Sequence, residues 1–135
     1  MSQGRVLVVD DEVEVRRSVR LILSKAGYDV DESEDPEAGV ALVKSGHGPA
    51  PLSAIITDLN MPKINEIIVL PYLRSQFPSC PIIVLSGSTK MEKSVNMFKQ
   101  AGVEFLAKPI NQEQLLGAVK KAVSEGKAKE KVATK

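Results

Sequence analysis

Short, uninterrupted runs of Val, Ile and Leu are the feature that most restricts what this chain can fold into. The stretches VLVV at 6–9, AII at 54–56 and IIVL at 82–85 show no alternation of apolar and polar residues. Strands of this kind are buried on both faces, which is typical of a parallel sheet covered by helices. With two further apolar runs, we expect five strands, at Arg5–Val9, Tyr28–Val30, Leu52–Thr57, Pro81–Leu85 and Val103–Ala107.

Helical patterns separate these runs. Apolar residues recur at helical spacing over Val15–Ala26, and Gly27 then favours a stop. Asp35 before Pro36 predicts an N-cap and a first helical residue. The other helices are expected at 36–44, within Asn65–Phe77, near Thr89–Gln100, and from Asn111, where Gln114 completes a pattern similar to a capping box. The alternation of strand and helix predicts a doubly wound α/β fold.

One residue conflicts with the third helical pattern. Pro71 lies in the middle of IIVLPYL, where proline removes a backbone hydrogen bond and clashes with the preceding turn. The helix therefore either begins late, near Ile68, or kinks, and we favour the late start or an irregular first turn.

Composition limits the class of protein. The chain has 135 residues, 43% of them hydrophobic and 26% charged, with a formal net charge of +1. These values indicate one globular domain and argue against bulk-charge binding to nucleic acid or membrane. The lone Cys80 excludes an internal disulfide and a multi-cysteine zinc site, and fits a cytoplasmic protein. We expect no signal peptide and no membrane span.

Polar residues follow the carboxyl ends of four predicted strands. They are Asp10 and Asp11 after the first, Asp58 after the third, Ser86 after the fourth and Lys108 after the fifth. Ligand sites of open α/β sheets lie beyond this edge, so we expect these side chains to converge. Clustered carboxylates without His or Cys suit Mg²⁺ or Mn²⁺, and a neighbouring lysine and hydroxyl suit phosphoryl transfer to an aspartate.

Each of these residues also has a purely structural interpretation. Asp11 could cap the first helix, with Glu14 at the third helical position. Asp58 and Ser86 could belong to turns, and Lys108 could be a solvated lysine. Taken together, these interpretations do not explain why four polar strand ends meet at one edge of the sheet.

Four motifs occur in order along the chain: VLVVDDE (6–12), ITDLNMP (56–62), VLSGS (84–88) and FLAKP (105–109). Together they resemble the receiver domain of bacterial two-component response regulators, of a chemotaxis-regulator-like kind without an output domain. The resemblance implies a five-stranded (βα)5 flavodoxin-like sandwich with strand order 2-1-3-4-5. It implies a receiver domain over residues 1–125, and we interpret residues 126–135 as a Lys-rich flexible tail.

The resemblance also implies roles for the site residues. Asp58 would be the phosphoacceptor and a ligand of Mg²⁺ (or Mn²⁺). Asp11 would bind the metal directly, Asp10 through water, and Asn60 through its backbone carbonyl. The other roles implied are a switch hydroxyl for Ser86, a phosphate-binding lysine for Lys108 and a switch aromatic for Phe105.

The function implied is that of a switch protein rather than an enzyme. A sensor histidine kinase or phosphotransfer protein would phosphorylate Asp58, because the one histidine, His47, lies in a loop outside the expected site. The surface formed by the helix near 89–100, the strand 103–107 and the helix from Asn111 would then change and bind an unknown downstream protein. We expect no direct nucleic acid or membrane binding, and a monomer or a weak phosphorylation-dependent dimer.

Other functions stay open. The chain could be the receiver part of a longer transcriptional regulator, or a phosphorylation-independent receiver-like interaction module. The full set of site residues argues against the second alternative, but Pro71 and Glu66, where several family members have Gly, keep it open. A haloacid-dehalogenase-like phosphatase would want a D-x-D pattern after the first strand, whereas Asp10 and Asp11 are adjacent. A flavodoxin-like electron carrier would want a phosphate-binding loop there, and acids would repel phosphate.

Overall fold

The computed structural model of the chain describes residues 4–45, 52–58, 66–78, 80–86, 103–107 and 110–133. Five parallel strands form one sheet in the order β2-β1-β3-β4-β5. They are β1 (Arg5–Val9), β2 (Asp29–Ser33), β3 (Ala54–Asp58), β4 (Ile82–Ser86) and β5 (Val103–Ala107). The helices are α1 (Val13–Lys25), α2 (Pro36–Lys44), α3 (Glu66–Gln76) and α5 (Gln112–Ala133). The doubly wound α/β fold and its strand order are confirmed.

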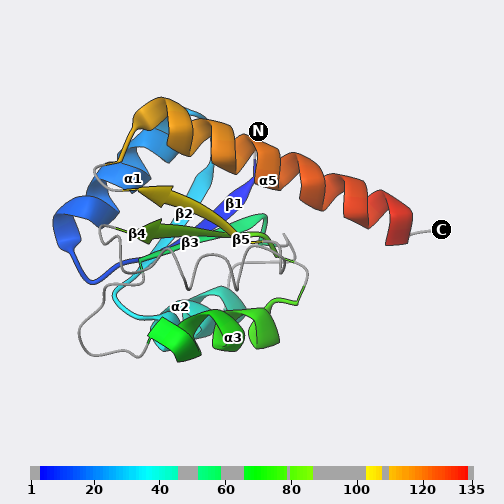
Figure 1. The fold of residues 1–135 in the computed structure, drawn as a ribbon, viewed down its shortest axis with the longest axis horizontal. Coiled ribbons are helices and arrows are strands. Elements are labelled where there is room, and N and C mark those ends of the chain that lie inside the picture. The colour runs from blue at the N-terminus through cyan, green and yellow to red at the C-terminus, as the bar shows by residue number, and fades with distance from the viewer. Residues whose placement is uncertain are drawn as a thin grey trace.

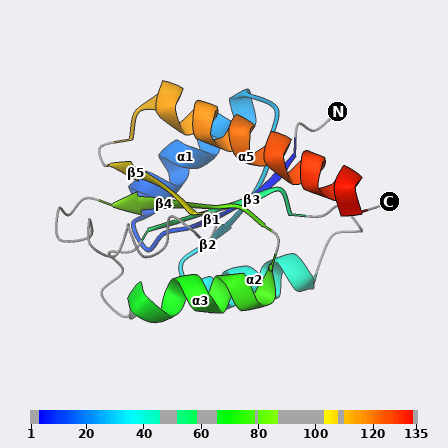
Figure 2. The same ribbon diagram turned by 45° about the vertical axis from the view of Figure 1, so that its right-hand side comes forward.

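The helices cover the sheet from both sides. Figures 1 and 2 show α1 and α5 on one face and α2 and α3 on the other. Alternate residues of β1 divide between the two sides: Leu7 and Val9 pack in the core under α2 and α3. Val6 and Val8 pack in the core under α1 and α5. The continuous apolar run of this strand is therefore explained by burial on both faces.

Helix ends follow the signals in the sequence where polar caps are present. The side chain of Asp35 accepts a hydrogen bond from the backbone N–H of Ala38 at 2.7 Å and so caps α2. Asn111 accepts in the same way from the N–H of Gln114 at 3.0 Å, before α5. Gly27, with a φ of 96°, follows α1 in a left-handed conformation that glycine adopts at little cost.

The structure differs from several expected boundaries. The third and fourth strands cover Ala54–Asp58 and Ile82–Ser86 rather than Leu52–Thr57 and Pro81–Leu85. The second strand covers Asp29–Ser33 rather than Tyr28–Val30, and its polar residues lie at the edge of the sheet. Helix α3 begins at Glu66 rather than near Ile68, and Pro71 lies inside it. Helix α5 continues to Ala133, so residues 126–133 have helical backbone. The flexibility of the tail at 126–135 stays a prediction.

These differences have physical reasons. Residues 29–32 of β2 are exposed or only partly buried, so this edge strand needs no continuous apolar run. Pro71 is exposed, so the backbone carbonyl that it leaves without a helical partner can be solvated. Lys, Glu and Ala favour helix, and a helix already formed extends without a new nucleation step. The helix expected near Thr89–Gln100 lies outside the described residues.

No helix in the described part of the chain combines the length and the hydropathy that crossing a membrane requires.

Candidate functional site

Strand register brings two aspartates together at the carboxyl edge of the sheet. Val9 of β1 lies opposite Thr57 of β3, so the residues that follow them, Asp10 and Asp58, are neighbours. Both aspartates are fully buried. The predicted convergence of the first and third strand ends is confirmed.

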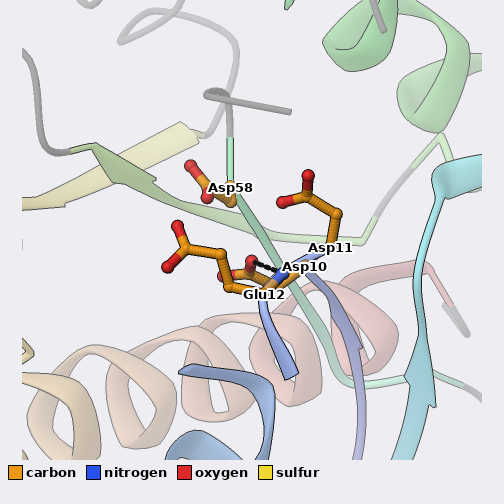
Figure 3. Close-up of side chains that lie close together, drawn as sticks. All are labelled: Asp10, Asp11, Glu12 and Asp58. Carbon is orange, nitrogen blue, oxygen red and sulfur yellow. Dashed lines mark hydrogen bonds between the residues drawn. The ribbon is translucent and has the colours of Figure 1, made fainter. Parts of the chain in front are cut away.

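Two further carboxylates complete a cluster, which we call the acidic cluster: Asp10, Asp11, Glu12 and Asp58. One carboxylate oxygen from each residue lies within 4.8 Å of the corresponding oxygens of the other three. Figure 3 shows these side chains gathered where β1 and β3 end. Asp11 and Glu12 are exposed, so the cluster has a buried base and a solvent-facing rim.

Backbone hydrogen bonds hold the segment that carries three of these acids. The N–H of Asp10 donates to the carbonyl of Ser33 at 3.0 Å, which continues the pairing of β1 with β2. The N–H of Glu12 donates to Oδ1 of Asp10 at 2.8 Å, the dashed line in Figure 3. This turn fixes the carboxylate of Asp10 relative to the start of α1.

Helix α1 has no side-chain N-cap. Glu12 occupies the N-cap position, with φ −85° and ψ 112°, and its own side chain makes no capping hydrogen bond. The interpretation that Asp11 caps this helix is therefore wrong. Without a structural role at the helix end, the side chain of Asp11 is available to the cluster.

Two arginines of α1 make contacts with the acidic segment and with the edge strand β2. Nη1 of Arg16 donates to the backbone carbonyl of Asp10 at 2.6 Å. Nε of Arg16 lies 3.5 Å from Oε1 of Glu32 in β2, and Nη1 of Arg20 lies 3.2 Å from Oε2 of the same carboxylate. These contacts connect the acidic segment to the edge strand.

The donor set of the cluster fits a hard divalent cation. All four side chains offer carboxylate oxygens, the ligands that Mg²⁺ and Mn²⁺ prefer. Four like charges within 4.8 Å repel one another, and two of them have no exposed surface. A bound cation would offset this repulsion, which is the physical reason for placing acids at the end of a core strand.

Not every predicted site residue falls within the described part of the chain. Ser86 ends β4 opposite Ala107 of β5, so its backbone lies at the same sheet edge. In the sequence, Lys108 directly follows Ala107. The side chains of Ser86 and Phe105, and all of Asn60, Lys108 and His47, lie outside the described residues. Their roles stay predictions.

Sequence reasoning missed two residues at the site. Glu12 was recognised as part of the acidic run but not as a member of the ligand set, although it directly follows Asp11. Arg16 received no role, because its contact with Asp10 depends on how α1 leads away from β1. A basic residue one helical turn after an acidic run is the signal that could have drawn attention to it.

Comparison with known proteins agrees with this geometry. The family model for the response regulator receiver domain matches residues 6–120. The DNA-binding transcriptional regulator NtrC of Bradyrhizobium sp. (strain RP501 Parasponia) is 30% identical over 127 residues, which are 94% of this chain and 26% of that protein. The cell cycle transcriptional regulator CtrA of Caulobacter vibrioides is 29% identical over 91% of this chain and 52% of its own length. The chain thus spans between a quarter and about half of these two relatives.

Solved structures give the same result. Chemotaxis response regulator CheY4 of Vibrio cholerae superposes with a TM-score of 0.74 at 31% identity, covering 90% of this chain and 99% of that one. NtrX from Brucella abortus superposes with a TM-score of 0.84 at 26% identity, covering 98% of this chain and 30% of that one. From its sheet order, its acidic strand ends and these similarities, the chain belongs to the response regulator receiver domain family.

Proposed function

We propose that this receiver domain takes up a phosphoryl group on Asp58, in a reaction that depends on a divalent cation at the acidic cluster. The observation that carries the proposal is the placement of Asp58, buried at the end of β3, within 4.8 Å of three other carboxylates. A structural aspartate would not require three acidic neighbours, whereas a phosphoacceptor beside a cation site does.

Asp10, Asp11 and Asp58 would hold the Mg²⁺ (or Mn²⁺), together with the predicted backbone carbonyl of Asn60. Glu12 is close enough to take part as a fourth carboxylate. When bound, the cation would neutralise negative charge on the entering phosphoryl group and on the carboxylates around it. Asp11 and Glu12 line the exposed side of the cluster and mark the direction from which a donor would approach.

The transfer itself needs only one covalent exchange. A carboxylate oxygen of Asp58 forms a bond to phosphorus while the P–N bond of the donor phosphohistidine breaks. The electron pair of that bond goes to the imidazole nitrogen, which takes up a proton. The product is an aspartyl phosphate on β3.

The remaining site residues would act on the phosphoryl group. We propose that Lys108 binds one phosphoryl oxygen and that the hydroxyl of Ser86 donates a hydrogen bond to another phosphoryl oxygen. Phe105 would change position together with Ser86. The strand ends support this arrangement, since Ser86 and Ala107 lie opposite each other at the edge where Asp58 ends β3. Phosphorylation would then shift the equilibrium between two conformations of a protein-binding surface near β5 and α5.

The donor would be a sensor histidine kinase or a phosphotransfer protein, and the output a change in contact with another protein domain. The family is one of signalling switches, so we propose no turnover of a separate substrate. The relatives that extend well beyond this chain favour the alternative that the receiver controls further domains of a longer regulator.

Intact-mass spectrometry tests the proposal directly. The wild-type chain is incubated with acetyl phosphate and Mg²⁺, with and without EDTA, beside Asp58→Asn and the control Asp29→Asn. Asp29 is exposed in β2 and does not belong to the acidic cluster. A single phosphoryl adduct is expected for wild type and Asp29→Asn, only with Mg²⁺, and none for Asp58→Asn.

The opposite result is equally informative. If neither acetyl phosphate nor a competent histidine kinase yields an adduct on the wild type, the chain acts as a phosphorylation-independent interaction module. An adduct that persists in Asp58→Asn would show that another residue is the acceptor.

A further inference from the structure

Arg16 connects the acidic cluster to the rest of the domain. It lies one turn into α1, and its side chain is only 14% exposed. Nη1 donates to the carbonyl of Asp10 at 2.6 Å, and Nε lies 3.5 Å from the carboxylate of Glu32 in β2. One planar guanidinium therefore contacts both the segment that carries the acids and the edge strand.

Asp10 is fixed through its backbone on both sides. Its N–H donates to the carbonyl of Ser33 at 3.0 Å, and its own carbonyl accepts from Arg16. The carboxylate accepts from the N–H of Glu12 at 2.8 Å. Asp10 is the first of three consecutive acids. The orientation of its backbone therefore determines from where the side chains of Asp11 and Glu12 extend.

We infer that Arg16 is a positioning residue for the acidic cluster, which holds the carboxylates in the arrangement that binds a divalent cation. The inference rests on the proposed function, because it assigns Arg16 a part in the cation affinity of that site. The arrangement matches the general rule that groups bonded to metal ligands are needed to orient them.

The charge of Arg16 and its hydrogen bond to Asp10 are expected to have opposite effects on Mg²⁺ binding. Removing a positive charge near four carboxylates would, by Coulomb's law alone, strengthen the binding of Mg²⁺. Removing the hydrogen bond to Asp10 would loosen the ligands and weaken binding. The direction of the change therefore separates a positioning role from a merely electrostatic one.

Arg20 provides a matched control. It pairs with the same Glu32 carboxylate at 3.2 Å, but its side chain is 54% exposed and this ion pair does not involve Asp10. Arg20→Met thus removes one positive charge from the same ion-pair group and leaves the contact between Arg16 and Asp10 in place.

The experiment is a calorimetric titration of the full chain with MgCl₂, for wild type, Arg16→Met, Arg16→Lys and Arg20→Met. Arg16→Met is expected to raise the dissociation constant about tenfold, at the low end of the effect of outer partners on metal affinity. Arg20→Met is expected to change it by less than about twofold, because exposed ion pairs contribute little. Arg16→Lys keeps the charge but not the two-sided contact, and is expected to fall between them.

Unchanged or tighter binding in Arg16→Met, or wild-type binding in Arg16→Lys, would overturn the inference. Thermal unfolding without Mg²⁺ checks that each variant is folded. If Arg16→Met does not fold, Arg16→Lys decides the question alone. Failure of the proposed function looks different: the wild type itself would then bind no Mg²⁺, and the inference would fall with it.

Discussion

Asp10 directly follows β1 and Asp58 ends the neighbouring strand β3, each one position beyond the pairing of Val9 with Thr57, and neither has any exposed surface. Two buried carboxylates side by side, with two more on the rim, are costly for a fold without a counter-ion. The cost is therefore expected to appear in the stability of the metal-free protein.

Asp58→Asn is expected to raise the free energy of unfolding by about 1–2 kcal/mol when EDTA is present, because it removes a buried charge from the repelling group. Urea denaturation measures this quantity. The exposed Asp29→Asn should change it by less than about 0.5 kcal/mol. Adding Mg²⁺ should shrink the advantage of Asp58→Asn, since the wild type, with all four carboxylates, gains more binding energy than the variant. A loss of stability in EDTA would show that Asp58 contributes more through its contacts than it costs through its charge.

Glu12→Gln is expected to weaken Mg²⁺ binding about threefold to tenfold, because it removes one of four charges that would surround the cation. The matched control is Glu14→Gln, an exposed acid in the first turn of α1 that is not part of the acidic cluster. Calorimetric titration of both variants with MgCl₂ gives the comparison. Equal affinity of the two variants would mean that Glu12 does not face the cation.

Two glycines in helices are expected to respond to alanine with opposite signs. A Cβ at Gly39 in α2 would lie 3.2 Å from Cδ2 of Leu7 and 3.3 Å from Cβ of Ser33, while one at Gly117 in α5 would meet nothing within 4 Å. Gly39→Ala should lower the free energy of unfolding by about 1 kcal/mol, because α2 must move away from the sheet.

Gly117→Ala should raise the same quantity by about 0.5–1 kcal/mol, since alanine is the better helix former. Thermal or urea unfolding of both variants tests the pair. Stabilisation by Gly39→Ala would indicate that the space between α2 and β1 adjusts more readily than the contacts imply.

Cys80 is expected to make stability fall at alkaline pH. Burial raises the pKa of its thiol from 9.0 to about 12, against a smaller opposing effect of the Arg74 charge. Below about pH 9 the thiol is protonated in both states, but above it the unfolded chain loses the proton first and becomes favoured. The wild type should therefore lose about 1 kcal/mol more than Cys80→Ala between about pH 8 and pH 10. Parallel pH profiles for the two proteins would contradict this.

Much of the fold could be predicted because the dominant signals are local. Buried runs such as VLVV predict strands whatever their neighbours, and Asp35 with Pro36 predicts a helix start at the residue where α2 begins. The edge strand was harder, because β2 is formed by polar residues whose partners are distant in sequence. Asp31, for example, pairs with Arg5 at 2.7 Å, and no local pattern reveals that contact.

The acids of the site could be predicted for a related reason: strand ends in a parallel sheet meet at one edge, so Asp10, Asp11 and Asp58 had to be close. What could not be predicted is how the chain turns from β1 into α1. That turn places Glu12 in the cluster and brings Arg16 back onto Asp10, and both depend on backbone angles over a few residues.

The sheet also acts as a partition. Leu7 and Val8 are bonded to each other, yet each packs in a different core, under α2 and α3 or under α1 and α5. A void opened on one side cannot be filled by side chains from the other, because the strand backbones lie between them. The losses in the free energy of unfolding caused by cavities in the two cores should therefore be additive. The carboxyl edge that carries Asp10 and Asp58 is supported by two separately packed layers.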